Sequence, residues 1–349
     1  MSTTKIAPRI LIIRRRYLGD IVLLGPVLKS LRNHWPEAKL AVMVDPAFAS
    51  ILSLNPDVDQ TLLIPTNLTN WIRLIPALRR AHFTHVLDLD NRPRTALITR
   101  FSGAPTRIAL HHGPEVRLPR CYTAHEIIEV DYLVNRHITD FCGRILRPIG
   151  VPFTPSAPKL VPRAEDIDFI RNLPAFASIP VGTAKILIHP GSRSPHRIWP
   201  PERFAAVITQ LRNANVSPII VAGPGEKEVI RQIQSHLASP ALTIDQRLTI
   251  PQLAALFANA NTLLCHDSGP MHLAASVGTR IVALFSSQNV ATWRPLGEKH
   301  LTLQAPMPCN PCLSPSFCVP SDSYHNHCVR HLSVNQVFAA VIQQLESKD

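Results

Sequence analysis

The sequence has no apolar run that approaches the roughly 18 residues of a membrane-spanning helix. Its first short apolar run, residues 11–13, is followed at once by three arginines, so no signal-peptide core is present. Only 7 of the 349 residues are cysteine, which excludes a small disulfide-stapled scaffold. We therefore expect a cytosolic protein with reduced cysteines, at most peripheral to a membrane.

Motifs of two large classes of protein are also missing. No predicted strand is followed by G-x-G-x-x-G, which disfavours a Rossmann dehydrogenase. No nucleic-acid-binding motif is present and aromatic residues make up only 6% of the chain, so we expect no nucleic-acid partner. Hydrophobic residues make up 46%, which excludes intrinsic disorder and, with the length, favours two domains.

What the chain does have is positive charge, unevenly spread. Arginine outnumbers lysine by 28 to 8, and the formal net charge is +12. Residues 1–160 hold 21 basic and 12 acidic residues, whereas residues 161–349 hold 15 and 12. A basic surface attracts anionic partners, and arginine binds phosphate and carboxylate through a planar fork. The first half is thus expected to meet an anionic ligand or membrane surface, although a GC-rich genome also favours arginine over lysine.

Apolar strands alternate with amphipathic helices in both halves of the chain. In the first half the pattern predicts strands over 10–13, 39–44, 61–64 and 85–89, and helices over 21–35, 46–54, 71–81 and 94–101. In the second half it predicts strands over 186–189, 218–222, 262–266 and 280–285, and helices over 201–214, 226–237, 251–258 and 270–277. This order implies parallel strands joined by helical crossovers, the α/β class with doubly wound sheets.

Prolines cluster between residues 148 and 184 and interrupt the alternation. We expect an N-terminal domain over 1–160, a linker over 161–184 with a short helix near 165–173, and a C-terminal domain over 185–349. The C-terminal domain carries a Cys-rich segment over 309–328 and a final helix that can pack back on the N-terminal domain.

Polar turns follow several predicted strands, and doubly wound sheets bind ligands outside the carboxyl ends of their strands. In the first turn, residues 14–20, Asp20 can cap the next helix or act as a general base. In the second, residues 189–193, backbone N–H groups together with Arg193 and Arg197 can hold a phosphate. In the third, residues 222–228, a carboxylate can hold ribose hydroxyls or complement the helix dipole.

A fourth turn, residues 265–275, is the most specific of them. Ser268 suits a helix N-cap, Pro270 the first helical turn and Gly278 the helix end. The N–H groups of residues 268–271 suit a diphosphate, and Asp267 suits a sugar hydroxyl. His272 is either a phosphate contact or a packing histidine.

These four turns, in this order, resemble those of glycosyltransferase family 9, the bacterial heptosyltransferases, and the resemblance runs from about Arg9 to about Leu345. The motifs that carry it are Leu18-Gly19-Asp20, His189-Pro190-Gly191, Trp199-Pro200 and the run Asp-Ser-Gly-Pro-Met-His-Leu-Ala-Ala at residues 267–275. The resemblance implies a GT-B fold, in which two Rossmann-like domains face a cleft. It also implies an acceptor site in the N-terminal domain and a sugar-nucleotide site in the C-terminal domain. The donor in that family is typically ADP-heptose, and the acceptor is the Kdo–lipid A inner core of lipopolysaccharide or an already heptosylated core.

By that similarity, Asp20 is the base that deprotonates the acceptor hydroxyl, which then attacks the anomeric carbon with inversion. Arg197 and the helix start would stabilise the leaving diphosphate without a bridging metal, so no cofactor is expected for the chemistry. Glu228 resembles an acidic ribose contact of the family, with Glu226 as the alternative. The implied donor-site residues are Ser192, Arg193, Arg197, Glu228, Asp267, Ser268, Gly269, Pro270, Met271 and His272.

Two positions depart from the family pattern. Tyr17 stands where a smaller residue is more common, which bears on the identity of the acceptor. His266 stands where Asn or Gly is frequent, which leaves the fold intact but can alter donor contacts. The basic first half suits an anionic, membrane-held acceptor. Its candidate contacts are Arg14, Arg15, Arg16, Arg92, Arg94, Arg117 and Arg120.

Four cysteines lie close together near the C-terminus: Cys309, Cys312, Cys318 and Cys328. A C-x2-C pair followed by two further cysteines suits a tetrahedral thiolate site for structural zinc or iron, and reduced thiols without metal are the alternative. The other three cysteines are isolated and are expected to pack in the core: Cys121, Cys142 and Cys265.

The sequence therefore predicts an inverting heptosyltransferase that acts as a monomer on the inner face of a Gram-negative inner membrane. One alternative is a GT-B glycosyltransferase with another nucleotide sugar, or with a protein or capsule acceptor. A second is a non-catalytic nucleic-acid- or lipid-binding protein that uses the +12 charge. The second alternative predicts strongly salt-dependent DNA binding and no effect of Asp20→Ala.

Overall fold

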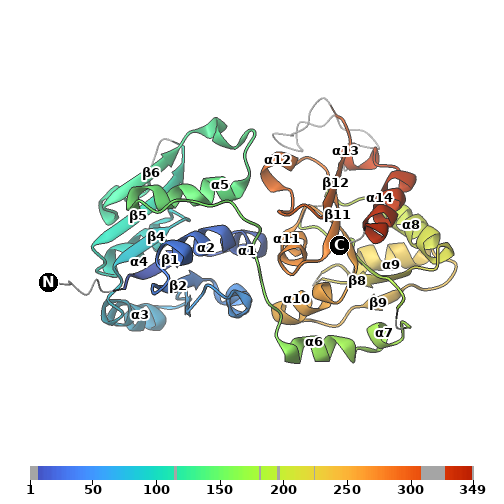
Figure 1. Ribbon diagram of the computed structural model, residues 1–349, viewed down its shortest axis with the longest axis horizontal. Coiled ribbons are helices and arrows are strands. Elements are labelled where there is room, and N and C mark those ends of the chain that lie inside the picture. Colours follow the sequence, from blue (N-terminus) through green and yellow to red (C-terminus); the bar gives the residue numbers. More distant parts are fainter. Residues whose placement is uncertain are drawn as a thin grey trace. The chain divides into compact units, whose positions relative to one another are not determined.

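The structure is a computed structural model, and it describes residues 7–113, 116–180, 182–194, 197–223, 225–307 and 327–347. The chain divides into two compact units, Met1–Lys159 and Leu160–Asp349 (Figure 1). Within the described ranges, no helix is both long enough and apolar enough to cross a membrane.

The first unit is built on a six-stranded parallel sheet in the order β3-β2-β1-β4-β5-β6. Its strands are β1 (Arg9–Ile13), β2 (Lys39–Val44), β3 (Gln60–Leu63), β4 (His85–Asp88), β5 (Thr106–His112) and β6 (Ala124–Ile128). Its α-helices are α1 (Leu18–Val22), α2 (Gly25–His34), α3 (Leu68–Arg80), α4 (Pro93–Phe101) and α5 (Ile138–Gly143). Short 3-10 helices are η1 (Pro46–Leu54), η2 (Pro119–Cys121), η3 (Val130–Leu133) and η4 (Arg144–Ile149).

The second unit repeats this plan with a sheet in the order β12-β11-β10-β7-β8-β9, again parallel. Its strands are β7 (Lys185–His189), β8 (Ser217–Val221), β9 (Leu242–Ile244), β10 (Thr262–His266), β11 (Arg280–Phe285) and β12 (His300–Gln304). Helices of the first part of this unit are α6 (Ala164–Arg171), α7 (Pro174–Ala177), α8 (Pro201–Asn213), α9 (Lys227–Ser235) and α10 (Ile250–Ala258). Those of its last part are α11 (Gly269–Ser276), α12 (Val290–Trp293), α13 (His327–Arg330) and α14 (Val334–Glu346).

Both sheets have the strand order of doubly wound dinucleotide folds, 3-2-1-4-5-6, when their strands are numbered within each unit. In such sheets the ligand crevice lies at the carboxyl ends of the strands where the order reverses. That point falls between β1 and β4 in the first unit and between β7 and β10 in the second. The turns that follow these four strands are therefore the first place to look for a site.

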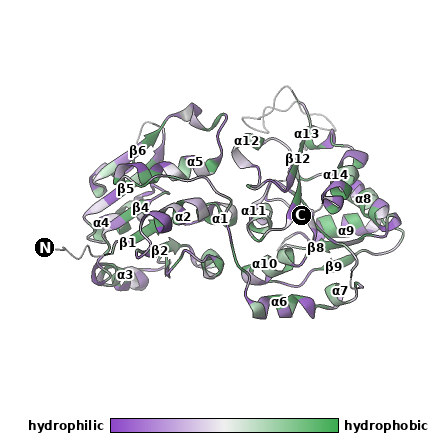
Figure 2. Ribbon diagram, in the orientation of Figure 1, coloured by the Kyte–Doolittle hydropathy of each residue, from purple (hydrophilic) through white to green (hydrophobic). Residues whose placement is uncertain are grey.

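Burial explains why these segments are strands and helices. β10 is buried at every position, and β2 and β11 at every position but the first, as expected for parallel strands covered on both faces. Helices such as α3 and α8 show hydrophilic and hydrophobic residues side by side (Figure 2). Their apolar faces cover the sheets.

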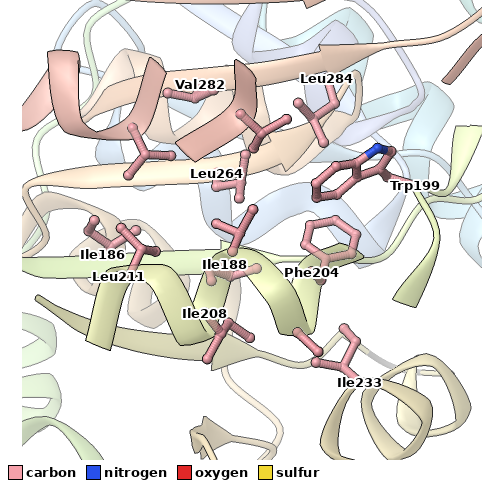
Figure 3. Close-up of a cluster of buried hydrophobic side chains, with 14 of the residues drawn as sticks. Ile186, Ile188, Trp199, Phe204, Ile208, Leu211, Ile233, Leu264, Val282 and Leu284 are labelled. Atoms are coloured by element: carbon pink, nitrogen blue, oxygen red, sulfur yellow. The ribbon is translucent and has the colours of Figure 1, made fainter. Parts of the chain in front are cut away.

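Trp199 anchors the core of the second unit (Figure 3). Its ring is fully buried and meets the ring of Phe204 edge-on, with 5.1 Å between the centroids. Its Nε1–H donates to the carbonyl of Leu332 at 3.1 Å. Because Arg197 lies two residues before Trp199, this anchor also fixes the turn that carries Arg197.

The final helix, α14, adds Val337 and Val341 to the same core. Its apolar face is thus buried within the core of its own unit. The short helix predicted near residues 165–173 is present as α6. Residues 151–159 run along α2, with the Thr154 amide donating to the Ser30 hydroxyl at 3.0 Å, and α6 packs against α10.

Two further sequence-based expectations differ from the structure. The helix predicted over 21–35 is two helices that break at Leu23 and Leu24, because Pro26 has no N–H to donate to the carbonyl of Val22. The strands β5, β6, β9 and β12 are missing from the prediction. They occupy outer positions in their sheets and are only partly buried, so their apolar pattern is weak.

Candidate functional site

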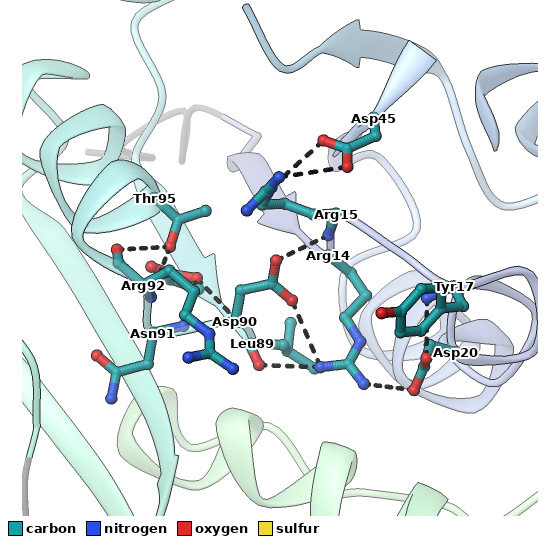
Figure 4. Close-up of polar contacts among 11 residues, drawn as sticks. Arg14, Arg15, Tyr17, Asp20, Asp45, Leu89, Asp90, Asn91, Arg92 and Thr95 are labelled. Atoms are coloured by element: carbon teal, nitrogen blue, oxygen red, sulfur yellow. Dashed lines mark hydrogen bonds and ion pairs between the residues drawn. The ribbon is translucent and has the colours of Figure 1, made fainter. Parts of the chain in front are cut away.

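In the first unit, a network of alternating charges lies at the point where the strand order reverses (Figure 4). Arg14 directly follows β1, and its Nη2 donates to Oδ1 of Asp20 at 2.5 Å. Its Nη1 donates to the carbonyl of Leu89 at 3.1 Å and lies 3.5 Å from Oδ1 of Asp90, just after β4. One guanidinium therefore bridges two carboxylates that come from different strand ends.

Asp20 is held on both of its oxygens. It is the third residue of α1, and its Oδ2 accepts the backbone N–H of Tyr17, the N-cap, at 2.8 Å. The expectation that Asp20 caps this helix is confirmed: its side chain caps from the third helical position, and Tyr17 occupies the N-cap position. The carboxylate keeps 17% of its exposure, so it remains reachable from solvent.

The two arginines that follow have different environments. Nε of Arg15 lies 3.3 Å from Oδ1 of Asp45, and its backbone N–H donates to Oδ2 of Asp90 at 3.1 Å. Arg16 is exposed, with its guanidinium 5.5 Å from the centroid of the Tyr17 ring. Of these three predicted acceptor contacts, Arg14 and Arg15 thus form ion pairs with carboxylates of the same unit, whereas Arg16 is exposed to solvent.

The remaining predicted acceptor arginines lie on other elements of the first unit. Arg92 is the exposed N-cap of α4, and Arg94 stacks on Trp71 with 5.6 Å between guanidinium and ring. Arg117 and Arg120 are exposed around η2. None of these four forms an ion pair within the described residues.

A buried carboxylate, Asp88, at the end of β4 holds the turn that follows this strand. It accepts the Tyr122 hydroxyl at 2.7 Å and the backbone N–H groups of Asp90 and Asn91. Burial raises the pKa of Asp88 to about 6, although these hydrogen bonds oppose the shift. Sequence reasoning missed Asp88 and Asp90, but acidic residues at a strand's carboxyl end are a signal that could have found them.

In the second unit, Arg197 and Asp267 form an ion pair beside the end of β10. Nη1 of Arg197 lies 3.1 Å from Oδ2 of Asp267. Burial raises the pKa of Asp267 to about 6, and Arg197 opposes that shift. Ser268 is the N-cap of α11 as predicted, but its buried hydroxyl makes no cap hydrogen bond. Gly278 ends the helix with a φ of +88°, also as predicted.

His266 ties two turns of this site together. Its Nε2 accepts the backbone N–H of Trp199 at 2.8 Å, and its Nδ1 lies 3.4 Å from the carbonyl of Gly191. Because Nε2 accepts a hydrogen bond, the ring proton is assigned to Nδ1, where it faces Gly191. The ring is fully buried, and burial lowers the pKa of His266 to about 3, so it is neutral at physiological pH.

Two acidic residues near the start of α9 differ sharply in position. Oε2 of Glu226 accepts the Gly223 N–H at 2.6 Å and lies 3.5 Å from Nε2 of His189. A Cβ on Gly191 would come within 1.5 Å of Glu226, so this turn closes over the carboxylate. Glu228 instead is exposed and binds Arg231 and Gln232 on the surface of α9. Glu226 therefore belongs to the cluster that contains His189.

The other predicted donor residues fall on the same two turns. Ser192 and Arg193 follow β7, and Gly269, Pro270, Met271 and His272 form the first half of α11. Met271 and His272 are buried, as a packing role requires. The structure thus brings residues 189–193, Arg197, Glu226 and residues 266–268 to one edge of the second sheet.

The predicted metal site cannot be built from what the structure describes. Cys309, Cys312 and Cys318 lie outside the described residues, and Cys328 lies in α13. Among the described residues, no group of three or more Cys, His, Asp or Glu side chains could hold a metal ion. Cys121, Cys142 and Cys265 are buried, as expected for packing residues.

Comparison with known proteins adds to this geometry. A family model described as glycosyltransferase family 9 (heptosyltransferase) matches residues 71–318. Lipopolysaccharide heptosyltransferase 3 of Escherichia coli is 26% identical over 293 residues, which cover 80% of this chain and 84% of that protein.

Solved structures show the same fold. A glycosyltransferase family 9 protein from Veillonella parvula matches with a TM-score of 0.83 and 22% identity over 97% of both chains. The E. coli heptosyltransferase WaaC, solved with ADP-2-deoxy-2-fluoro heptose, matches with a TM-score of 0.68 and 17% identity over 96% of this chain and 99% of that one. The two parallel sheets with their covering helices are thus the α/β architecture of the GT-B fold.

Proposed function

Because the chain belongs to glycosyltransferase family 9 (heptosyltransferase), we propose that it transfers heptose from ADP-heptose to the inner core of lipopolysaccharide. The acceptor is Kdo–lipid A or an already heptosylated core. The name of the E. coli relative and the ADP-heptose analogue bound to WaaC support this donor and acceptor class. The observation that carries the proposal is a carboxylate, Asp20, fixed at the reversal point of the first sheet.

In the proposed reaction Asp20 is the general base. Its carboxylate takes the proton of the acceptor hydroxyl as that oxygen forms a bond to the anomeric carbon. The bond from the anomeric carbon to the ADP oxygen breaks on the opposite face, which inverts the configuration. Arg14 and the Tyr17 amide hold the carboxylate in place, so no reorganisation is needed when the hydroxyl arrives.

The second unit is proposed to hold the donor. Negative charge develops on the leaving diphosphate, and fixed cations and N–H groups stabilise it best. Arg197 and the start of α11 at Ser268 supply these groups, and the turn with Arg193 adds a further cation. We assign the ribose contact to Glu226 on geometry, with Glu228 as the family-based alternative.

The acceptor suits the basic first half of the chain. Lipid A with Kdo is anionic and membrane-held, and exposed arginines such as Arg16, Arg92 and Arg120 offer guanidinium forks for it. We therefore propose peripheral binding to the inner face of the inner membrane, as a monomer. The Cys-rich segment is proposed to hold structural zinc or iron, which metal analysis of anaerobically purified protein tests.

Substitution of the base tests the mechanism. Asp20→Asn should lower transfer about 100- to 10,000-fold, the usual contribution of a general base, with an unchanged fold. The matched control is Asp57→Asn, since the Asp57 side chain is similarly exposed at 14% and pairs with Lys29. Near-normal transfer by Asp20→Asn would show that Asp20 is not the base. Turnover of UDP- or GDP-sugars in place of ADP-heptose would favour a different donor.

A further inference from the structure

A solvent-open hollow of about 500 Å³ lies on the first unit, apart from the residues assigned above. Its walls come from η3, α5, η4 and the segment that follows η4. Three arginines line it: Arg136, Arg144 and Arg147. Its volume lies within the range of about 300–1,000 Å³ that small-molecule sites occupy.

Two of the three guanidiniums share one close carboxylate. Arg144 forms an ion pair with Glu126, and Nη1 of Arg147 lies 3.7 Å from the same Oε1 atom. Among the described residues no carboxylate lies within ion-pair distance of Arg136, and Asp140, which also lines the hollow, pairs with none of the three. The hollow therefore holds more positive charge than its own carboxylates neutralise.

Tyr132 keeps two of these cations together. The guanidiniums of Arg136 and Arg144 lie 4.7 and 5.2 Å from the centroid of its ring. Burial alone would lower the pKa of Arg144, but hydrogen bonds to Tyr132 and Glu126 raise it, so this arginine stays charged. Two cations are thus held beside one another before any ligand arrives, and among the described residues only one of them, Arg144, has a carboxylate partner, Glu126.

Part of the lining of the hollow is apolar. Val151 and Phe153 line the hollow, and the Phe153 ring lies so close to Gly143 that a Cβ there would come within 2.4 Å of it. Gly143 is therefore required for the position of this ring. A lining that combines an aromatic ring with several cations suits a ligand with a sugar face and an anionic group.

We propose that this hollow binds a phosphomonoester on a saccharide, with Arg136 and Arg147 contacting the phosphate and Phe153 contacting the sugar. Arginine forks match the geometry of phosphate oxygens, and Arg147 is 73% exposed and thus free to turn toward a ligand. The site does not involve Asp20, so it does not rest on the proposed transfer reaction. A free sugar phosphate and a phosphorylated lipid headgroup offer the same chemistry.

Binding measurements on the full chain test the proposal. Calorimetric titration with glucose 1-phosphate should give saturable binding, and glucose should give none. The double substitution Arg136→Gln/Arg147→Gln should weaken binding at least about tenfold, since hydrogen bonds to charged groups are lost. Flotation with vesicles of phosphatidylcholine, with or without phosphatidic acid, tests the lipid source with the same variants.

Two controls separate this site from the donor turns. Arg80→Gln removes an exposed arginine of the same unit outside the hollow and should leave binding unchanged. Arg197→Gln removes a cation of the second unit and should not alter the component that depends on Arg136. Thermal unfolding checks the fold of each variant. Arg136 and Arg147 are both exposed, so their replacement by glutamine should leave the fold intact. The proposal is overturned if neither probe binds, or if the Arg136→Gln/Arg147→Gln variant binds both as the wild type does.

Discussion

Arg14 and Asp20 are joined at 2.5 Å, and the same arginine reaches Asp90 at 3.5 Å. Both side chains of the closer pair are only 17% exposed, so the loss of either partner leaves a poorly solvated charge. The guanidinium therefore has two functions at once: it holds the two strand ends together and it fixes the orientation of Asp20.

A double-mutant cycle measures this coupling. Arg14→Met alone should lower the free energy of unfolding by about 3 kcal/mol, since it leaves two carboxylates without their shared cation. In Arg14→Met/Asp20→Asn the cost should be smaller than the sum of the single changes, with a coupling of about 1–3 kcal/mol. Urea denaturation of the four proteins supplies the numbers. Additive effects would mean that the ion pair does not stabilise this turn.

A second prediction concerns acid and stability. The pKa of Asp88 is raised by burial to about 6, whereas an unfolded chain titrates its aspartates near pH 4. Between these values the folded protein binds more protons than the unfolded one. The stabilising contribution of Asp88 is therefore fully present below about pH 4 and is lost as the pH rises through about 6. Asp88→Asn should abolish this dependence, so the stability difference between wild type and variant should change by about 3 kcal/mol from pH 4 to 7.

Asp59 provides a control, because its pKa is shifted in the opposite direction from that of Asp88. Hydrogen bonds from the Leu40 amide and from Arg32 outweigh its desolvation and lower the pKa of Asp59. The stabilising contribution of Asp59 to the free energy of unfolding is present above the ordinary pKa of an aspartate. It is lost as the pH falls below about 4. Denaturation curves of Asp59→Asn should thus differ from wild type least in acid. Equal pH dependence of wild type and Asp88→Asn would contradict the assignment of the proton to Asp88.

The sequence was sufficient to predict the family and the positions of most of the central strands. β1, β7, β10 and β11 are continuous apolar runs because both faces of the sheet are covered, and polar turns follow them directly. The resemblance to glycosyltransferase family 9 that these turns carried is confirmed. The strands β5, β6, β9 and β12 were missed because a partly buried strand needs fewer apolar residues, although the edge strand β3 was predicted.

Side-chain partners could not be predicted in the same way. Asp20 and Arg14 are close in sequence, but Asp90 lies 70 residues beyond Asp20 and meets them only because β4 pairs with β1. Likewise, the choice between Glu226 and Glu228 depends on which face of a turn each occupies. A motif specifies residue types and spacing, whereas the sheet register decides which strand ends meet.

His266 yields a prediction for donor binding. His266→Ala leaves the buried N–H of Trp199 without an acceptor and frees the Gly191 turn. The cost of such a group is about 1–3 kcal/mol, so the KM for the nucleotide sugar should rise about tenfold while kcat changes less. His266→Gln can restore an acceptor and should recover much of the loss. The control is His300→Ala, a half-buried histidine of β12; an equal rise in KM for both alanine variants would argue against a specific role.

The two acidic residues of the third turn can be separated by neutral substitutions of the same shape. Glu226→Gln keeps an oxygen for the Gly223 amide but removes the charge next to His189. Glu228→Gln removes a charge that pairs with Arg231 on an exposed helix surface, where such pairs contribute little. If the carboxylate of the closed turn contacts the ribose, Glu226→Gln should raise the KM for the nucleotide sugar about tenfold, and by more than Glu228→Gln does. A larger effect at Glu228 would instead favour the family-based assignment, and it would require the Arg231 pair to open when the donor binds. Initial rates over a range of donor concentrations, with acceptor saturating, distinguish these outcomes.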